Sequence, residues 1–283
     1  MNRHFRFILY TAVGAFALIG LFFTIVFAGM QFGLFNVRGS IAERNTFFAP
    51  QKNVGVGINA PCVDRTLSTC VWTQTPEWEV IQGGLGKDAA IITAVSEKTG
   101  VSSRLIAAVV VPEQTRFFTS EREVFKRYFE PLKILGSLSQ FSLGVSGIKQ
   151  ETAVSIEELA GSTTSPFYPG DGMARLLAYE PGVQHDAVLY ARLTDAKNHY
   201  YSYLYTALFI KEVEAQWKAA GYDISKNPGA VVTLFNIGFK KSHPNPSPSV
   251  AGSTIETGGK KYSYGELGAN FYNSTELTDI FPK

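Results

Sequence analysis

The stretch "TGVSSRLIAAVVVPEQTRF", residues 99–117, places a carboxylate directly behind an unbroken apolar run. The run "LIAAVVV" predicts a buried helix that begins at Ser102 or Ser103. Because proline lacks an amide hydrogen and clashes with the preceding turn, we expect Pro112 to interrupt this helix. Glu113 then stands at the helix end. It is either an ordinary exposed glutamate or a buried carboxyl in the protonated form, which is the form that a general acid needs.

The composition of the chain sets broad limits on its class. It has 283 residues, of which 45% are hydrophobic, so it is long enough to bury one large core. Its 26 basic and 24 acidic residues leave a formal net charge of +2. This balance argues against a nucleic-acid partner, which would need a basic surface.

The N-terminus carries an apolar segment. Residues 7–35 contain no charged side chain and follow Arg3 and Arg6. A bilayer is spanned by about 20 apolar residues, so we expect residues 1–35 to form a single-pass transmembrane anchor. The alternative is a cleaved signal peptide, although the apolar part of such peptides is usually about 7–15 residues long. Basic residues flank the segment on both sides, so they do not fix its orientation.

The only two cysteines, Cys62 and Cys70, lie in the short stretch "PCVDRTLSTC". Behind an export segment, such a pair predicts a disulfide and an oxidising compartment, with two free thiols as the alternative. No histidine or second cysteine pair lies nearby to complete a zinc site. We interpret residues 36–76 as a polar juxtamembrane stalk or cap that carries this pair.

The remainder, residues 77–283, predicts a single mainly α domain. Helix patterns alternate with turns rich in glycine and proline, and no fixed-period repeat is present. Asn227 followed by Pro228 is a typical start of a helix. The expected helices cover residues 88–100, 102–111, a segment from about 121, 149–161, much of 184–220, and 228–238.

The loop-like stretch "FSLGVSGIKQETA", residues 141–153, is rich in glycine but poor in chemically active groups. Ser146 stands in a near match to the G-x-S-x-G nucleophile motif, but Ile148 replaces the last glycine. A serine hydrolase that uses Ser146 with His185, His199 or His243 therefore stays a weak alternative. The histidines form no metal-binding motif, and we expect neither a metal nor an organic cofactor.

Three segments of the chain, in this order, resemble the motifs of the lysozyme-like lytic transglycosylase family, which includes the SLT domain and is related to goose-type lysozyme. In that family a helix delivers a catalytic glutamate, a glycine-containing loop and helix follow, and an asparagine lies on a later helix. The resemblance covers residues 88–239. The matching residues are Glu113, then Ser142, Gly144, Ile148, Thr152 and Ala153, then Asn236 and Gly238, with Tyr203 and Leu204 at the position of a Tyr-Leu pair.

The resemblance implies a lysozyme-like helical domain that cleaves peptidoglycan. Glu113 would be the only catalytic carboxylate. It would protonate the β-1,4 bond between N-acetylmuramic acid and N-acetylglucosamine and then take a proton from the muramyl C6 hydroxyl, giving a 1,6-anhydro end. The residues expected to bind the glycan are Ser142, Gly144, Ser146, Gly147, Ile148, Tyr203 and Asn236.

Two alternatives to this enzyme remain. One is a muramidase that hydrolyses the same bond, and the other is a non-catalytic, membrane-anchored protein that binds glycan as a scaffold. The expected partners are peptidoglycan strands, the membrane, and an envelope-spanning machine. The expected location is the bacterial cell membrane, with the domain on its outer side.

Overall fold

The structure is a computed structural model that describes residues 68–119 and 142–283, together with scattered helical positions between residues 3 and 24. The chain divides into two units, Met1–Val56 and Gly57–Lys283. Within the described positions, no helix combines the length and the apolar character needed to cross a membrane. Most of the predicted anchor, residues 1–35, lies outside the described residues, as do Cys62 and the helix expected from about residue 121.

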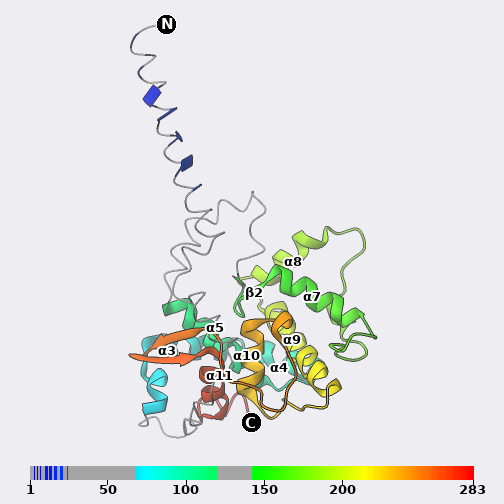
Figure 1. Cartoon of the computed structure of the whole chain (residues 1–283). Helices are drawn as coiled ribbons and strands as arrows, with labels where there is room; N and C mark the ends of the chain where they lie inside the picture. The colour runs from blue at the N-terminus through cyan, green and yellow to red at the C-terminus, as the bar shows by residue number, and fades with distance from the viewer. Residues whose placement is uncertain are drawn as a thin grey trace. The chain divides into compact units, whose positions relative to one another are not determined.

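The second unit is mainly α-helical, as expected from the sequence (Figure 1). Two short antiparallel hairpins, β1 with β2 and β3 with β4, complete it. Short 3₁₀ helices cover Ser68–Gln74, Ala174–Leu177 and Phe239–Lys241. The helices and strands are α3 (Pro76–Lys87), α4 (Ala89–Thr99), α5 (Ser103–Thr119), β1 (Ser142–Leu143), β2 (Ile148–Lys149), α7 (Gln150–Gly161), α8 (His185–Thr194), α9 (Tyr200–Ala219), α10 (Pro228–Ile237), β3 (Thr254–Thr257), β4 (Lys260–Ser263) and α11 (Tyr264–Asn273).

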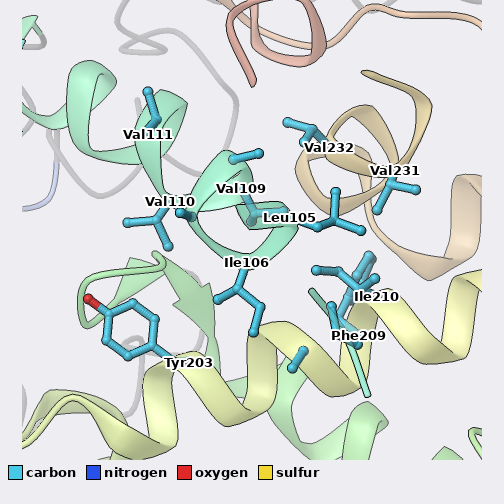
Figure 2. Packing of buried hydrophobic residues seen from close by; sticks show 14 of the residues in the cluster. Leu105, Ile106, Val109, Val110, Val111, Tyr203, Phe209, Ile210, Val231 and Val232 are labelled. Atoms are coloured by element: carbon cyan, nitrogen blue, oxygen red, sulfur yellow. The ribbon is translucent and has the colours of Figure 1, made fainter. Parts of the chain in front are cut away.

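Helix α5 is the centre of the core. It packs against α3, α4, α9, α10 and α11, so its apolar run has no face left for solvent. Figure 2 shows Ile106 of α5 directed toward α9, between Tyr203 and Phe209. A helix that is apolar all round must be buried on all sides. This burial explains why the carboxylate that follows the run lies at the edge of the core.

The expectation that Pro112 interrupts the helix is wrong, because α5 continues through it to Thr119. A proline at this position removes the amide that would bond to the carbonyl of Ala108, at a cost of about 3 kcal/mol. Tertiary packing offsets this cost. Helix α11 lies directly over the region: a Cβ on Gly268 would stand 2.7 Å from the Ala108 oxygen, and the Tyr264 hydroxyl donates to the Val109 oxygen at 3.2 Å.

Several expected helix ends are confirmed. Gly100 follows α4 with a φ of 74°, and the Asn227 side chain accepts a hydrogen bond from the Ala230 amide at the start of α10. The helical region expected within residues 184–220 is divided into α8 and α9. Residues of the predicted stalk or cap also belong to the core, since Cys70 and Trp72 are buried in it.

Arg104 joins the start of α5 to the C-terminal end of the chain. It is fully buried. A guanidinium has five N–H donors, and those of Arg104 reach five main-chain carbonyls. These acceptors belong to the last turn of α11 and to the tail behind it. They are the oxygens of Phe271 (2.8 Å), Tyr272 (2.7 Å), Ser274 (2.8 Å), Glu276 (3.0 Å) and Phe281 (3.0 Å).

We expect Arg104→Lys to destabilise the protein strongly. A lysine keeps the charge, but its three donors at one point leave buried carbonyls without partners, and each costs about 1–3 kcal/mol. The midpoint of thermal unfolding of the full chain should fall by roughly 6–12 °C. Arg175→Lys, the same change at an exposed arginine, is the control and should move the midpoint little. Equal midpoints for the two variants would contradict this role of Arg104.

A polar cluster holds α8 against α7. Glu157 of α7 accepts hydrogen bonds from the Tyr179 hydroxyl at 2.5 Å and from the Tyr205 hydroxyl, and His185 Nε2 lies 2.6 Å from its second oxygen. The other ring nitrogen of His185 lies 3.0 Å from Asp186. Hydrogen bonds to Asp186 and Glu157 raise the pKa of His185 above its ordinary value of 6.5.

This cluster makes stability depend on pH. A raised folded-state pKa means that protonated His185 stabilises the fold below about pH 6.5, and that this contribution is lost as the pH rises through the folded-state pKa. The side chain is 44% exposed, so we expect less than about 1 kcal/mol. In urea unfolding, His185→Gln should therefore cost more at about pH 5.5 than at about pH 8.5. A pH-independent difference, or the same trend in the exposed control His243→Gln, would refute the role of His185.

Candidate functional site

The carboxylate of Glu113 lies where α5 meets α11 and the β1–β2 hairpin. Its side chain is 11% exposed. Arg116 Nη2, one turn further along α5, lies 2.5 Å from Oε1 and 2.7 Å from Oε2. The Tyr264 hydroxyl of α11 lies 3.3 Å from Oε2 and shares its one proton between that oxygen and the Val109 oxygen. Both oxygens of Glu113 therefore accept from donors.

The glycine loop between β1 and β2 covers one side of Glu113. Gly147 has a φ of 62°, a conformation that favours glycine, and a Cβ built on it would overlap the Glu113 carboxylate. Gln114, the residue after Glu113, ties the loop down, because its Nε2 donates to the Val145 oxygen at 2.5 Å. The absence of a side chain at position 147 thus lets the loop backbone lie against the carboxylate.

The other end of the loop is fixed on α8 and α9. Gly144 has a φ of 65°, and a side chain there would overlap the Leu193 oxygen and the Ser202 hydroxyl. Ser146 is fully buried, and its hydroxyl donates to the Ser202 oxygen at 3.2 Å. The buried Ser146 side chain offers no surface to a glycan, so the expected glycan contact at this residue stays a prediction that concerns its backbone. A buried hydroxyl is also unsuited to be the nucleophile of a serine hydrolase.

Two further predicted glycan contacts, Ile148 and Tyr203, are also core residues. Ile148 is 3% exposed and Tyr203 is 2% exposed, so neither side chain has a surface that could touch a sugar. The Tyr203 hydroxyl donates instead to Asp88 at 2.7 Å, and His199 Nδ1 lies 2.5 Å from the same Asp88 oxygen. These contacts fix the start of α9 against α4. The sequence could not separate this role from sugar binding, because both use a tyrosine on the long helix.

Asn236 lies behind the site, near the end of α10. Its Oδ1 accepts a hydrogen bond from the Ser253 amide at 2.9 Å. A Cβ on Gly252 would stand 2.9 Å from Asn236 Oδ1 and 2.9 Å from the Cβ of Tyr264. Asn236 therefore positions the segment that packs against Tyr264, whose hydroxyl reaches Glu113. The Asn236 side chain is half-buried, and its expected contact with glycan stays a prediction. The Ser142 side chain lies outside the described part of the chain, so its expected contact with glycan also stays a prediction.

Sequence reasoning missed Tyr264 and Arg116. Tyr264 is fully buried, and burial together with the charge of Glu113 raises its pKa, so its hydroxyl remains a donor. The signal for Arg116 was present, because residues three apart on a helix lie side by side. Tyr264 lies 151 positions from Glu113 and gave no comparable local signal.

A second carboxyl in the core has the buried, protonated state that was one of the two alternatives expected for Glu113. Glu212 of α9 is fully buried, and neither of its oxygens has a hydrogen-bond partner among the described residues. Burial raises its pKa to about 10, so it is protonated at neutral pH. Without exposed surface, however, Glu212 has no access to a substrate. In the described part of the chain, no group of three or more His, Cys, Asp or Glu side chains is arranged to hold a metal ion.

Cys70 is in the disulfide-bonded form and is fully buried. Its expected partner, Cys62, lies outside the described residues, so this pairing stays a prediction. Comparisons of the chain with models of protein families, with curated proteins and with solved structures find no match.

The close approach of Gly147 to Glu113 can be tested by a double-mutant cycle. Gly147→Ala should destabilise the chain by more than Gly100→Ala. The control Gly100 also has a positive φ but has open space around its Cβ, so only the backbone strain of about 1–2 kcal/mol applies there. In a Glu113→Ala background, the Gly147→Ala cost measured by urea unfolding should fall to that of the control. An unchanged cost would mean that the carboxylate does not occupy this space.

Proposed function

We propose that this chain is a membrane-anchored lytic transglycosylase with a lysozyme-like domain, which cleaves the bond between N-acetylmuramic acid and N-acetylglucosamine in peptidoglycan. One observation carries the proposal: Glu113 and the glycine loop, distant in sequence, meet at one point, with Gly147 against the carboxylate. The resemblance implies that the catalytic glutamate and the glycine loop serve the same glycan site. Asn236, from the third matching segment, holds the chain at Gly252 and Ser253, which packs against Tyr264 in the same region.

In this mechanism Glu113 acts first as acid and then as base. Protonated Glu113 gives its proton to the glycosidic oxygen, the bond from muramyl C1 to that oxygen breaks, and the N-acetylglucosamine leaves with a free hydroxyl. The carboxylate then takes the proton of the muramyl C6 hydroxyl while that oxygen bonds to C1. The product is a 1,6-anhydro end, and no water is consumed. A second carboxylate, which ordinary glycosidases use, is not needed.

Tyr264 and the loop have supporting roles in this reaction. The Tyr264 hydroxyl donates to Glu113 Oε2 and so favours the carboxylate that forms after the first proton transfer. Gly147 and Val145 place loop backbone beside the same group, where it could line a glycan groove. In this role the loop acts through its backbone, since its Ser146 and the following Ile148 are buried.

One observation favours the non-catalytic alternative. Arg116 contacts both oxygens of Glu113, and a guanidinium at this distance stabilises a carboxylate, whereas the first step needs a protonated carboxyl. A glycan-binding scaffold would have no such requirement. A hydrolysing muramidase would share the first step and would differ only in the group that attacks C1.

The test is the digestion of purified peptidoglycan by the full chain, followed by mass spectrometry of the released fragments. The wild type should release fragments with 1,6-anhydro ends, and Glu113→Gln should lose at least about 100-fold in rate, because glutamine cannot transfer the proton. Glu151→Gln, the same change at an exposed carboxylate of α7, should retain activity.

Other outcomes separate the alternatives. Reducing ends would identify a muramidase, and full activity of Glu113→Gln would reject Glu113 as the acid. Binding of peptidoglycan without any release of fragments would leave the scaffold as the function.

A further inference from the structure

Helix α8 is attached to the domain largely by polar contacts at its two ends. It packs on α7 and α9 (Figure 1), but of its ten residues only Leu189 and Leu193 are buried. In the last turn, Arg192 donates to the Leu177 oxygen at 2.8 Å and to the Ala178 oxygen at 2.6 Å. A short helix with so little buried apolar surface is marginal by itself, so each polar contact matters for its docking.

In the first turn of α8, His185 lies between two carboxylates. Its Nε2 is 2.6 Å from Glu157 Oε2 of α7, and its Nδ1 is 3.0 Å from Asp186 Oδ1. A neutral imidazole has one N–H donor, whereas the protonated ring has two. Only protonated His185 can donate to both carboxylates, because the neutral ring directs a lone pair at one of them. The observed geometry is therefore that of the charged ring.

The two carboxylates stabilise this charge against the helix dipole. The positive end of the α8 dipole lies at the first turn and disfavours a cation there. The hydrogen bonds to Asp186 and Glu157 nevertheless raise the pKa of His185 above its ordinary value of 6.5. The contacts of the charged ring are therefore fully present below about pH 6.5 and are lost as the pH rises through the folded-state pKa.

The remaining titratable groups of this cluster keep their charge near neutral pH. The Tyr179 ring lies 4.7 Å from the imidazole, and the Tyr205 hydroxyl of α9 donates to Glu157. Burial and the hydrogen bonds to Glu157 raise the pKa of Tyr179 to about 12 and also raise the pKa of Tyr205, so both hydroxyls stay neutral donors. The Arg192 guanidinium, which is always charged, lies 4.0 Å from the Tyr179 ring centre.

The other end of α8 touches the glycine loop of the candidate site. The Leu193 oxygen accepts from the Ser202 hydroxyl at 3.3 Å, and Gly144 lies directly against both groups. Gly144 and Gly147 close a single turn, in which the Gly147 amide donates to the Gly144 oxygen at 3.2 Å. Gly147 in turn lies against the Glu113 carboxylate. One turn of the chain thus connects the end of α8 to Glu113.

We propose that His185 is a pH-sensitive clamp, whose protonated form holds α8 on α7 and thereby keeps the glycine loop ordered against Glu113. When the ring loses its proton to solvent, one of its two hydrogen bonds is lost, and α8 and the loop open more often as one unit. The clamp itself does not depend on the proposed function. Its effect on cleavage rests on that function and gives the same site a regulation, in which deprotonation of His185 lowers the rate.

Hydrogen–deuterium exchange of the full chain, read by mass spectrometry, tests the clamp. Exchange is followed at about pH 5.5 and at about pH 8.5, with times scaled for the intrinsic pH dependence of amide exchange. The variants are His185→Gln, which carries no charge, and His185→Arg, which is charged at both pH values. The control is His243→Gln, at an exposed histidine outside the cluster.

In wild type, the protection of α8 and of the glycine loop should fall by the same factor from the lower to the higher pH. We expect a factor of about two to five, the scale of a half-exposed ion pair. Both segments should stay less protected than α5, which distinguishes local opening from global unfolding. His185→Gln should show the low protection at both pH values, His185→Arg the high protection at both, and His243→Gln the wild-type response.

Two results of the exchange experiment would overturn the clamp or its connection to the site. If wild type, His185→Gln and His185→Arg respond identically to pH, the charge of His185 does not hold α8. If α8 responds while the glycine loop does not, the helix opens without any consequence for Glu113.

Digestion of purified peptidoglycan by the same four proteins separates the clamp from the proposed function. At about pH 8.5, His185→Arg should cleave about two to five times faster than wild type, and at about pH 5.5 His185→Gln should be slower than wild type by the same factor. Equal rates for all variants at both pH values would overturn the regulation while leaving the enzyme in place. The expected exchange pattern without any cleavage would reject the proposed function and support the clamp.

Discussion

The buried guanidinium of Arg104 is the interaction on which the candidate site depends. Its five hydrogen bonds fix the end of α11 and the tail to the start of α5. The same two helices meet again further along, where Tyr264 of α11 contacts Glu113 of α5. Two contacts at opposite ends of the helix pair define its register, so Arg104 positions the Glu113 site from a distance.

Small residues make the close packing at this helix pair possible. A Cβ on Gly268 would stand 2.7 Å from the Ala108 oxygen, and a Cβ on Gly265 would overlap the Thr233 hydroxyl of α10. Larger residues would push α11 outward and withdraw Tyr264 from Glu113. The loop glycine Gly147 acts in the same way on the other side. The site is thus defined by positions without side chains as much as by the polar groups themselves.

Local features of the structure followed from the sequence, and features that depend on distant contacts did not. The cap at Asn227 and the glycine end of α4 need only their neighbours along the chain, and both are confirmed. The continuation of α5 through Pro112 depends on α11, which lies far away in the sequence. The resemblance assigned Gly147 and Glu113 to one glycan site but did not predict that they would touch. It gave no sign that Ser146 faces inward, because the burial of a loop side chain is decided by the helices beneath it.

Glu113 and Glu212 together show why the charge of the site is the decisive question. Burial without a partner keeps Glu212 protonated, as an acid catalyst must be, but the same burial removes it from any substrate. Glu113 lies at the edge of the core with 11% of its side chain exposed, and there Arg116 supplies a counter-charge. A group with access to water needs a second influence to become an acid, since desolvation alone is weak there. The proposed acid catalysis would therefore require the ion pair between Arg116 and Glu113 to open first.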